Sequence, residues 1–306
     1  MRWSAHISWL FAELPYLERP AAARREGFGV VESAWPEDEA DREVLPDAVA
    51  AAGVDVALLN APAGDVAAGE RGFVNDPGRR AEAEAGFISA VELAVAVGAP
   101  LVNVLVGRAR LDLPAARQRA AVVTALRSFA AIATGAGVAI VLEPINAIDS
   151  PGFLVPTAQA AARLIDEVGE ERIGLLLDTY HVVRAGEDPL AAVRDHRSLI
   201  RHLQVSESPG RGVPGSGSLD LDALLAAFEA VGYDGAVGLE FDPRGPTPAA
   251  LAFLREPGAA AGSLQAAPRA APSRARSASA LVNDAPASST SSSPSAVHNP
   301  NSPPVP

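Results

Sequence analysis

The chain has 306 residues, of which 48% are hydrophobic, and its formal net charge is -12 at pH 7. This length is enough to bury one large core or two modest ones. The acidic balance argues against a nucleic-acid partner, whose phosphates require a basic face, and no stretch approaches the roughly 18 to 20 uninterrupted apolar residues that span a bilayer.

The absence of cysteine excludes disulfides and thiolate chemistry. The first 15 residues carry Glu13 and have no sustained apolar run, so they are interpreted as the first strand and not as a signal peptide. A cytoplasmic location without membrane association is therefore expected.

One unit repeats along residues 1–256: an amphipathic helix, a glycine that ends it, and a short apolar strand. The predicted strands lie at 3–7, 30–32, 54–60, 101–106, 138–142, 173–178, 200–204 and 236–240. The predicted helices lie at 14–26, 46–52, 157–168, 189–197, 221–231 and 248–255, with one around Phe87 that ends at Gly98 and one around Leu126 that ends near Gly137.

This alternation of apolar strands and helices predicts a parallel sheet covered by helices. Eight such units in about 256 residues suit a closed (β/α)8 TIM barrel, and a doubly wound open sheet is the alternative. The barrel is favoured because chemically active side chains end strands five to eight, and only closure brings strand eight round beside strand five. Residues 257–306 are rich in Ala, Ser and Pro and are predicted to be a disordered tail.

Four successive apolar strands end in an oxygen-bearing side chain: Glu143, Asp178, Gln204 and Glu240. A carboxylate at the end of an apolar strand is costly to desolvate unless a positive charge lies beside it, and residues 138–146 contain no Lys or Arg. Glu143 alone would more often be a helix cap or a solvated strand end. Together with three similar residues, it predicts a divalent-metal site.

Five stretches carry a resemblance to a known family: LNAPAGDVAAGERGF at 59–73, LEPIN at 142–146, DTYH at 178–181, HLQVSESPGR at 202–211 and GYDGAVGLEF at 232–241. Together they resemble the hydroxypyruvate isomerase family, part of the larger group of xylose-isomerase-like barrels, over roughly residues 1–255. The resemblance implies a metal-dependent aldose-ketose type isomerisation, here of hydroxypyruvate to tartronate semialdehyde.

The resemblance also implies roles for individual residues. The family's metal ligands match Glu143, Asp178, Gln204 and Glu240, and its acid/base pair matches Glu143 and Glu240. Residues that contact substrate in related sugar epimerases match His181, Arg211 and Asp149. Dimers and tetramers are common in this barrel group, which favours a homo-oligomer.

The implied chemistry explains these residue types. A carbonyl moves by one carbon when a carboxylate removes the neighbouring proton and the same or the opposite carboxylate returns it, through an enediolate. A divalent cation stabilises the developing oxyanion, and all-oxygen ligands favour Mg²⁺ or Mn²⁺ over zinc. The substrate carboxylate calls for an arginine, for which Arg211 is preferred to Arg71 and Arg108 because its loop follows a ligand strand.

Several residues have simpler interpretations. His181 could only cap the loop after strand six, and Asp149 could cap its own loop. Asn60 and His6 either line the pocket or bond to backbone. The glycines between 210 and 217 lack the lysine and the helix start of a phosphate loop, so a flexible loop is predicted there.

The family pattern differs at Ser216 to Ser218, where a glutamate is usual, and at Glu207 and Trp9. None of these positions is a predicted ligand, so the differences concern the substrate. The alternatives are a 2-oxo-tetronate isomerase, a ketose 3-epimerase, a metal-dependent endonuclease of the same barrel group, and a binding protein without catalysis. A small keto or hydroxy acid is the expected partner in the preferred interpretation.

Overall fold

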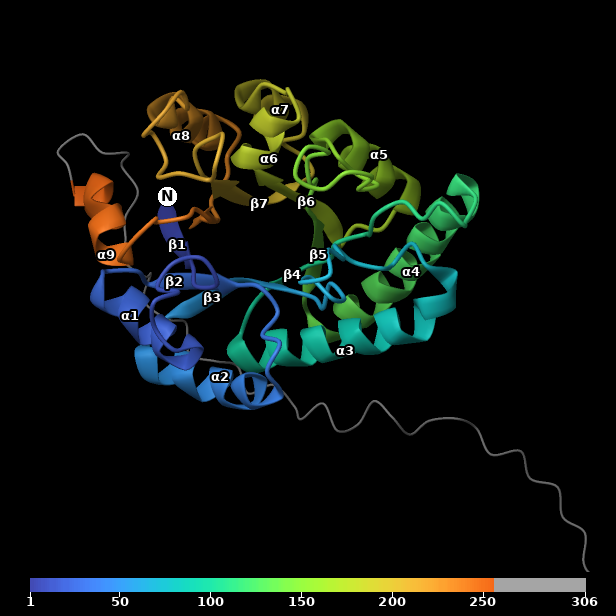
Figure 1. Ribbon diagram of the computed structural model, residues 1–306, viewed down its shortest axis with the longest axis horizontal. Helices are drawn as coiled ribbons and strands as arrows, with labels where there is room; N and C mark the ends of the chain where they lie inside the picture. The colour runs from blue at the N-terminus through green and yellow to red at the C-terminus, as the bar shows by residue number, and fades with distance from the viewer. Residues whose placement is uncertain (256–306) are drawn as a thin grey trace, which may run out of the picture. The chain divides into compact units, whose positions relative to one another are not determined.

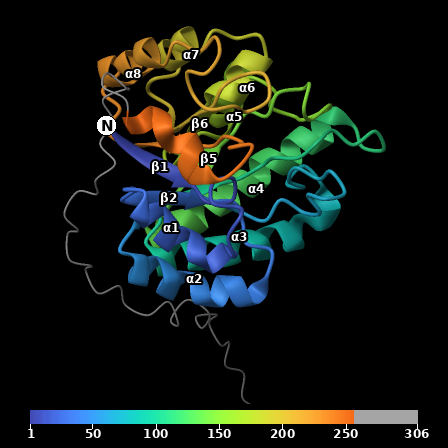
Figure 2. The ribbon, with the colours of Figure 1, turned by 60° about the vertical axis from the view of Figure 1, so that its left-hand side comes forward.

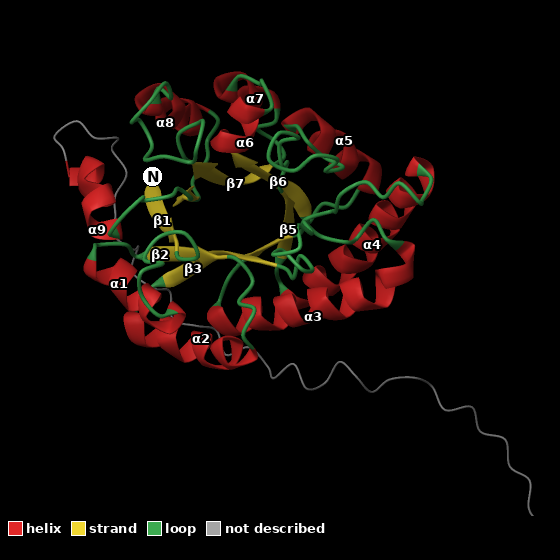
Figure 3. Cartoon of the chain, in the orientation of Figure 1, coloured by secondary structure: helices red, strands yellow, loops and turns green. Residues whose placement is uncertain are grey.

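The computed structural model describes residues 1–255. Within this range eight parallel strands close into a barrel in the chain order β1 to β8, and helices surround it (Figures 1 and 3). The predicted (β/α)8 barrel is thus confirmed. The disordered tail predicted at 257–306 lies outside the described residues.

The strands of the barrel are β1 (Arg2–His6), β2 (Val30–Ser33), β3 (Asp55–Asn60), β4 (Leu101–Asn103), β5 (Ala139–Leu142), β6 (Ile173–Asp178), β7 (Ile200–Val205) and β8 (Ala236–Leu239). The ring closes between β1 and β8, where Arg2 lies opposite Ala236 and Ala5 opposite Leu239. The strands are almost continuously apolar because the barrel interior buries one face and the helices bury the other.

The helices are α1 (Arg19–Arg25), α2 (Glu39–Ala52), α3 (Arg80–Val97), α4 (Ala115–Ala136), α5 (Ala158–Val168), α6 (Thr179–Arg184), α7 (Pro189–Asp195), α8 (Leu221–Ala230) and α9 (Thr247–Ala250), with 3-10 turns η1 (Tyr16–Glu18), η2 (Pro77–Arg79) and η3 (Leu251–Arg255). Helices α2 and α8 lie on opposite sides of the barrel in both views (Figures 1 and 2). As predicted, α2 to α5 each end at a left-handed glycine.

Several predicted boundaries are wrong, among them the start of the first helix, which is Arg19 and not Leu14. Helix α2 begins at Glu39 and not at Pro46, because Asp38 Oδ1 caps it by accepting from the Ala40 amide at 2.9 Å. Strand β4 ends at Asn103 and not at residue 106. Only one further bond follows, from the Val104 amide to the Val141 carbonyl at 2.9 Å, before the chain leaves the sheet.

Helix α6 has six residues. It is absent from the predicted helices, since the sequence leads us to expect a loop after strand six. It starts directly after β6 because Asp178 Oδ1 accepts from the Tyr180 amide at 2.9 Å. His181 therefore lies on the first turn of a helix and not on a loop.

Two apolar clusters hold the barrel. The larger one fills the space between the strands and the helices, and within it the rings of Phe87 on α3 and Phe129 on α4 stack with centroids 4.3 Å apart. The smaller one is inside the barrel and consists of Leu58, Val141 and Leu176. Each of these three precedes a strand-end polar residue by two positions, on the same face, so the polar layer at the strand ends rests on an apolar plug.

Among residues 1–255, no helix has the length and apolarity needed to cross a membrane.

The stacked aromatic pair yields a stability prediction. Phe129→Ala removes a ring that is 2% exposed, and the transfer loss plus the cavity should lower the free energy of unfolding by about 3–5 kcal/mol. The matched control is Ile88→Ala, next to Phe87 on α3 but 39% exposed, which should change stability by about 0.5 kcal/mol or less. Urea unfolding of both variants measures the difference, and equal losses would contradict this account of the core.

Candidate active site

A cavity of about 1130 Å³ lies at the carboxyl ends of the strands and collects most of the predicted site residues. Its walls include Asn60, Arg71, Glu143, Asp149, His181, Arg211 and Glu240. Asp178 and Gln204 are each 1% exposed and face one another in the register of β6 and β7. Asp178 borders the cavity from its buried side, because it contacts Arg211, which lines the cavity.

A second cavity, of about 540 Å³, contains none of these predicted residues. Residues from the amino-terminal ends of strands line it, among them Arg2, Val30 and Asp55. The chemistry of a (β/α)8 barrel is located at the opposite, carboxyl face, so the larger cavity is the candidate active site.

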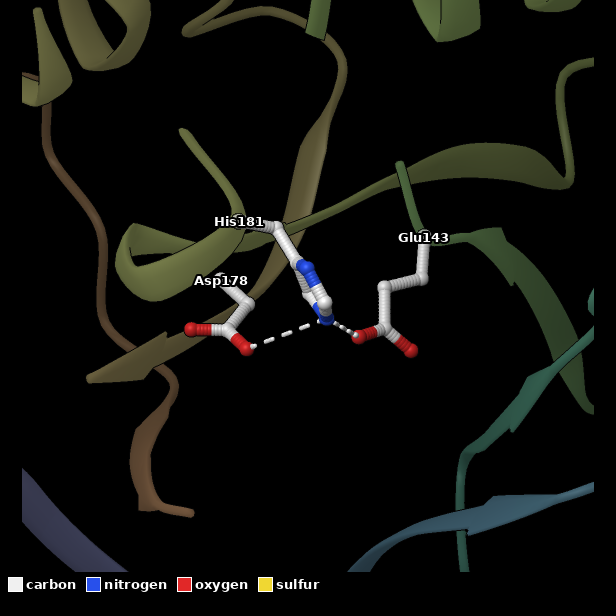
Figure 4. Close-up of side chains that lie close together, drawn as sticks. All are labelled: Glu143, Asp178 and His181. Atoms are coloured by element: carbon white, nitrogen blue, oxygen red, sulfur yellow. Dashed lines mark ion pairs between the residues drawn. The ribbon is translucent and has the colours of Figure 1, made fainter. Parts of the chain in front are cut away.

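Three buried side chains form a group that can hold a metal ion. Glu143, Asp178 and His181 each offer a ligand atom within 4.8 Å of the others. His181 projects between the two carboxylates (Figure 4), with Nε2 3.6 Å from Glu143 Oε1 and 3.9 Å from Asp178 Oδ2. The residue predicted as a substrate contact thus lies at the centre of the carboxylate group.

One oxygen of each carboxylate is committed to the scaffold and the other faces the site. Glu143 Oε2 accepts from Asn103 Nδ2 at 2.7 Å, and Asp178 Oδ1 caps α6. Asp178 Oδ2 makes no hydrogen bond within residues 1–255, although Arg211 Nη2 lies 3.1 Å away as an ion-pair contact. Glu143 Oε1 is therefore available for a ligand, and Asp178 Oδ2 could bind one beside Arg211.

His181 is oriented by Asn146, whose Oδ1 accepts from the amides of Ile148 and Asp149. This turns the side-chain Nδ2 of Asn146 toward His181 Nδ1, at 2.7 Å. The backbone N–H of Asn146 donates to the same Nδ1 at 3.3 Å. Nδ1 is then the acceptor, so a neutral ring carries its proton on Nε2, toward the carboxylates. Burial, and next the charge of Arg211, hold the pKa of His181 well below its usual range.

Arg211 brings a positive charge into the group. Its Nη1 lies 3.3 Å from Glu240 Oε1 and its Nη2 3.1 Å from Asp178 Oδ2. The guanidinium carbon is 5.1 Å from the ring centroid of Trp9 and 4.5 Å from that of Tyr180, which are cation-π distances. Nη2 is also 2.6 Å from His181 Nε2, so both nitrogens of the ring face N-H donors although a neutral imidazole accepts at only one.

The loop that carries Arg211 is fixed by Glu207. The backbones of Glu207 and Gly212 exchange two hydrogen bonds, at 2.9 and 3.1 Å. The Glu207 carboxylate accepts from the amides of Gly217, Ser218 and Leu219. Because a Cβ on Gly217 would lie 2.7 Å from this carboxylate, glycine is needed there for packing and not for phosphate binding.

The carboxylates repel one another. Burial, followed by the charges of Glu240 and Asp178, raises the pKa of Glu143 well above its usual value. Burial raises the pKa of Asp178 to about 7, against the lowering effect of Arg211. Added positive charge is therefore the condition under which all of these groups ionise.

The residues present fit a hard divalent cation. Glu143 and Asp178 each turn one oxygen to the site, and Gln204 Oε1 is buried with no hydrogen-bond partner in the described chain. Glu240 is close enough for its charge to act on both carboxylates. An unpaired buried oxygen beside ionisable carboxylates is what a cation with oxygen ligands requires.

The other predicted residues occupy varied positions. Asn60 Oδ1 and His6 Nδ1 are buried without hydrogen-bond partners among residues 1–255 and both residues line the cavity, which favours pocket lining over backbone bonding. Asp149 is exposed and bonds Asn146 and Arg184. Arg71 bonds the carbonyls of Val66 and Glu70 at the rim.

Arg108 does not line the cavity. Its guanidinium donates to the carbonyls of Pro151 and Gly69, so it ties two loops together. Of the three arginines considered for the substrate carboxylate, only Arg211 reaches the carboxylate group.

Sequence reasoning missed three polar residues that support this site: Asn103, Asn146 and Glu32. Glu32 is 0% exposed and bonds both His202 and Gln204. For Asn103 and Glu32 the available signal was a polar residue inside an apolar strand. Asn146 belongs to the LEPIN stretch, but its contact with His181 depends on a neighbouring strand.

Comparisons with known proteins agree with the fold. Residues 20–256 match the family model described as xylose isomerase-like TIM barrel. A Mus musculus protein named putative hydroxypyruvate isomerase is 37% identical over 83% of this chain and 94% of its own. The hydroxypyruvate isomerase of Escherichia coli (strain K12) is 35% identical over 83% and 98%.

Two further proteins extend the comparison. A protein of Cupriavidus necator named 2-oxo-tetronate isomerase is 34% identical over 83% of this chain and 97% of its own. The crystal structure of a Brucella melitensis protein named AP endonuclease, family 2, superposes with a TM-score of 0.79 at 30% identity, over 83% and 98% of the two chains.

The raised pKa values predict how the metal-stripped protein responds to pH. The pKa of Asp178 rises from 3.8 to about 7 on folding, so the folded protein binds the proton more tightly than the unfolded chain. The stability that Asp178 contributes by binding this proton is fully present below about pH 4 and is lost as the pH rises through 7. Thermal unfolding with a chelator should show a melting temperature that falls between pH 5 and 8.

Asp178→Asn is the control, because it removes this titration and should flatten the fall. Mg²⁺ should raise the melting temperature of the wild type more at pH 8 than at pH 5. A melting temperature of the stripped wild type that rises over this interval would contradict the electrostatic account.

Proposed function

Because the chain belongs to the hydroxypyruvate isomerase family of xylose isomerase-like TIM barrels, we propose that this isomerase interconverts hydroxypyruvate and tartronate semialdehyde with a divalent cation, Mg²⁺ or Mn²⁺. The observation that carries the proposal is the buried group of Glu143, Asp178 and Glu240 beside a neutral His181 and the cation Arg211. Cytoplasmic location and homo-oligomeric assembly stay predictions.

The reaction requires the transfer of one proton from one carbon atom of the substrate to the next. A carboxylate removes a proton from C3 of hydroxypyruvate, and the resulting enediolate receives a proton at C2, while the hydroxyl proton passes from O3 to O2. The product is the isomeric aldehyde, so atoms balance without an oxidant. We assign the two carboxylates to Glu143 and Glu240, since each lines the cavity and Glu240 raises the pKa of Glu143.

The other site residues hold the substrate. His181, with its proton on Nε2, is oriented to donate to a substrate oxygen in the carboxylate group. Arg211 is the residue we assign to the substrate carboxylate, because its planar fork makes paired hydrogen bonds with carboxylates. Movement of Arg211 from His181 to the substrate would also remove the contact between two donors.

The residues assigned to the metal are Glu143, Asp178, Gln204 and Glu240. A cation held there supplies Lewis-acid polarisation of the substrate carbonyl and stabilises the negative charge that develops in the reaction. The apolar plug of Leu58, Val141 and Leu176 beneath this layer limits water on its inner side, which strengthens each of these interactions.

A 2-oxo-tetronate, with one more carbon, is the second candidate substrate. The Cupriavidus necator relative carries that name, and a cavity of about 1130 Å³ has space for four carbons. Nuclease activity, suggested by the name of the Brucella melitensis protein, is disfavoured because a net charge of -12 opposes a phosphate backbone. A 3-epimerase activity on ketoses is tested by the same experiment.

The proposal is tested by proton exchange in D2O. The protein is stripped of metal, reloaded with Mg²⁺ and given hydroxypyruvate or a four-carbon 2-oxo acid, and the substrate signals are followed by NMR. Deuterium should enter beside the carbonyl only with Mg²⁺, and an aldehyde product should appear. Exchange of a free ketose but of neither acid would overturn the substrate assignment, while the faster acid identifies the preferred chain length.

Glu143→Gln and Glu240→Gln should each lower kcat by about 100- to 10,000-fold, the usual contribution of a general acid or base. The matched control is Glu37→Gln, the same chemical change at an exposed carboxylate of the same cavity, which should leave kcat unchanged. Steady-state kinetics at saturating Mg²⁺ make the comparison. Full activity in either of the first two variants would remove that residue from the acid/base pair.

Arg211→Gln should lower kcat/KM by about 10- to 150-fold, corresponding to about 1.5–3 kcal/mol for a hydrogen bond to a charged group. Arg71→Gln, which changes the other cavity arginine in the same way, should lower kcat/KM by less than about threefold. A larger loss in Arg71→Gln than in Arg211→Gln would transfer the carboxylate-binding role to Arg71.

A further inference from the structure

Glu32 is a buried acid that the proposed reaction does not use. It lies on β2 and is 0% exposed, and it does not line the cavity at the carboxyl ends of the strands. Burial of a carboxylate is costly unless hydrogen bonds compensate for it, so its contacts indicate what it does.

The carboxylate of Glu32 reaches across the barrel interior to β7. Its Oε1 accepts from Gln204 Nε2 at 2.8 Å, and its Oε2 lies 2.8 Å from His202 Nε2. Strands β2 and β7 are not neighbours, because β1 and β8 stand between them in the closed ring. On β8, a Cβ at Gly238 would lie 2.2 Å from Glu32 Oε1, so the glycine leaves the space that this contact requires.

This contact determines which end of the Gln204 amide faces the site. A carboxylate offers only acceptors, so the NH₂ group of Gln204 turns to Glu32 and its carbonyl oxygen turns away. That oxygen, Oε1, is buried and has no hydrogen-bond partner among residues 1–255. Leaving a buried oxygen without a hydrogen-bond partner is unfavourable, which indicates a ligand that the oxygen binds.

A glutamine needs such a constraint to serve as a metal ligand. Its amide can present either NH₂ or oxygen to the same space, and only the oxygen coordinates a cation. The neighbouring residue Asp178, also assigned to the metal, is oriented by capping α6. Gln204 is oriented by its hydrogen bond to Glu32.

We propose that Glu32 is a positioning residue that holds the Gln204 amide with its carbonyl oxygen toward the metal site. This inference rests on the proposed metal dependence, since it assigns an orientation to one of the proposed ligands. The alternative is that Glu32 serves only as a structural partner of His202.

The test measures Mn²⁺ affinity without any substrate. Metal-stripped full-length protein is titrated with Mn²⁺, and free Mn²⁺ is followed by electron paramagnetic resonance. Glu32→Gln, which offers an NH₂ or an oxygen to Gln204 and no longer fixes the amide, should weaken Mn²⁺ binding by about 10- to 100-fold, as for other groups that orient metal ligands. Glu32→Asp, too short for the same contact, is measured in parallel and should also weaken binding.

The matched control is His202→Gln. It removes the second partner of Glu32 but leaves the hydrogen bond between the Glu32 carboxylate and Gln204 in place. Mn²⁺ affinity should therefore stay within about threefold of the wild type even if the melting temperature falls. If Glu32 acts only as a structural partner of His202, the variants at the two positions should weaken Mn²⁺ binding alike, and that result would overturn the inference.

A double-mutant cycle adds a second criterion. In the Gln204→Leu background, Glu32→Gln should cause no further loss of Mn²⁺ affinity, because the amide that it orients is gone. An additive loss would overturn the inference. If the wild type does not bind Mn²⁺, the proposed metal dependence is overturned together with the inference. If the wild type binds Mn²⁺ tightly and neither Glu32→Gln nor Glu32→Asp changes the affinity, only the inference is overturned.

Discussion

The structure depends on the need for positive charge among carboxylates that the barrel buries side by side. Glu143 and Asp178 are held by strand ends that rest on an apolar plug, and burial together with neighbouring negative charge raises the pKa of each. Arg211 supplies one positive charge through contacts with Asp178 and Glu240. The same electrostatic demand makes this group suitable for a divalent cation, and it explains why an arginine from a loop reaches so far into a buried site.

Barrel closure is what creates this constraint. The pairing of β1 with β8 completes a ring in which the ends of β5, β6, β7 and β8 surround one space. Each of these strands contributes a polar residue at its end; those of β5 and β6 lie above the apolar residues Val141 and Leu176, whereas Gln204 of β7 lies above the buried pair of His202 and Glu32. On the side of β3, β5 and β6 the reactive groups thus lie above Leu58, Val141 and Leu176.

Around the carboxylates, several site residues are oriented by a partner from elsewhere in the chain. Asn103 holds Glu143, Asn146 contacts Nδ1 of His181, and Glu32 holds Gln204. A side chain held in this way loses little further freedom when a ligand binds, which favours affinity and correct geometry at the reacting atoms.

The alternation of strands and helices and the four strand-end residues Glu143, Asp178, Gln204 and Glu240 were predictable from the sequence, because hydrophobic periodicity and glycine caps are local signals. Local signals located α2 only in part, since Pro46 suggested a start where Asp38 is the actual cap, and they missed α6. Only the folded chain shows that Arg211 turns inward to Asp178 and that Glu32 reaches Gln204. Both contacts join residues that are far apart along the chain. The contact of Glu32 with Gln204 also requires ring closure, because β2 and β7 are not neighbours and meet only across the barrel interior.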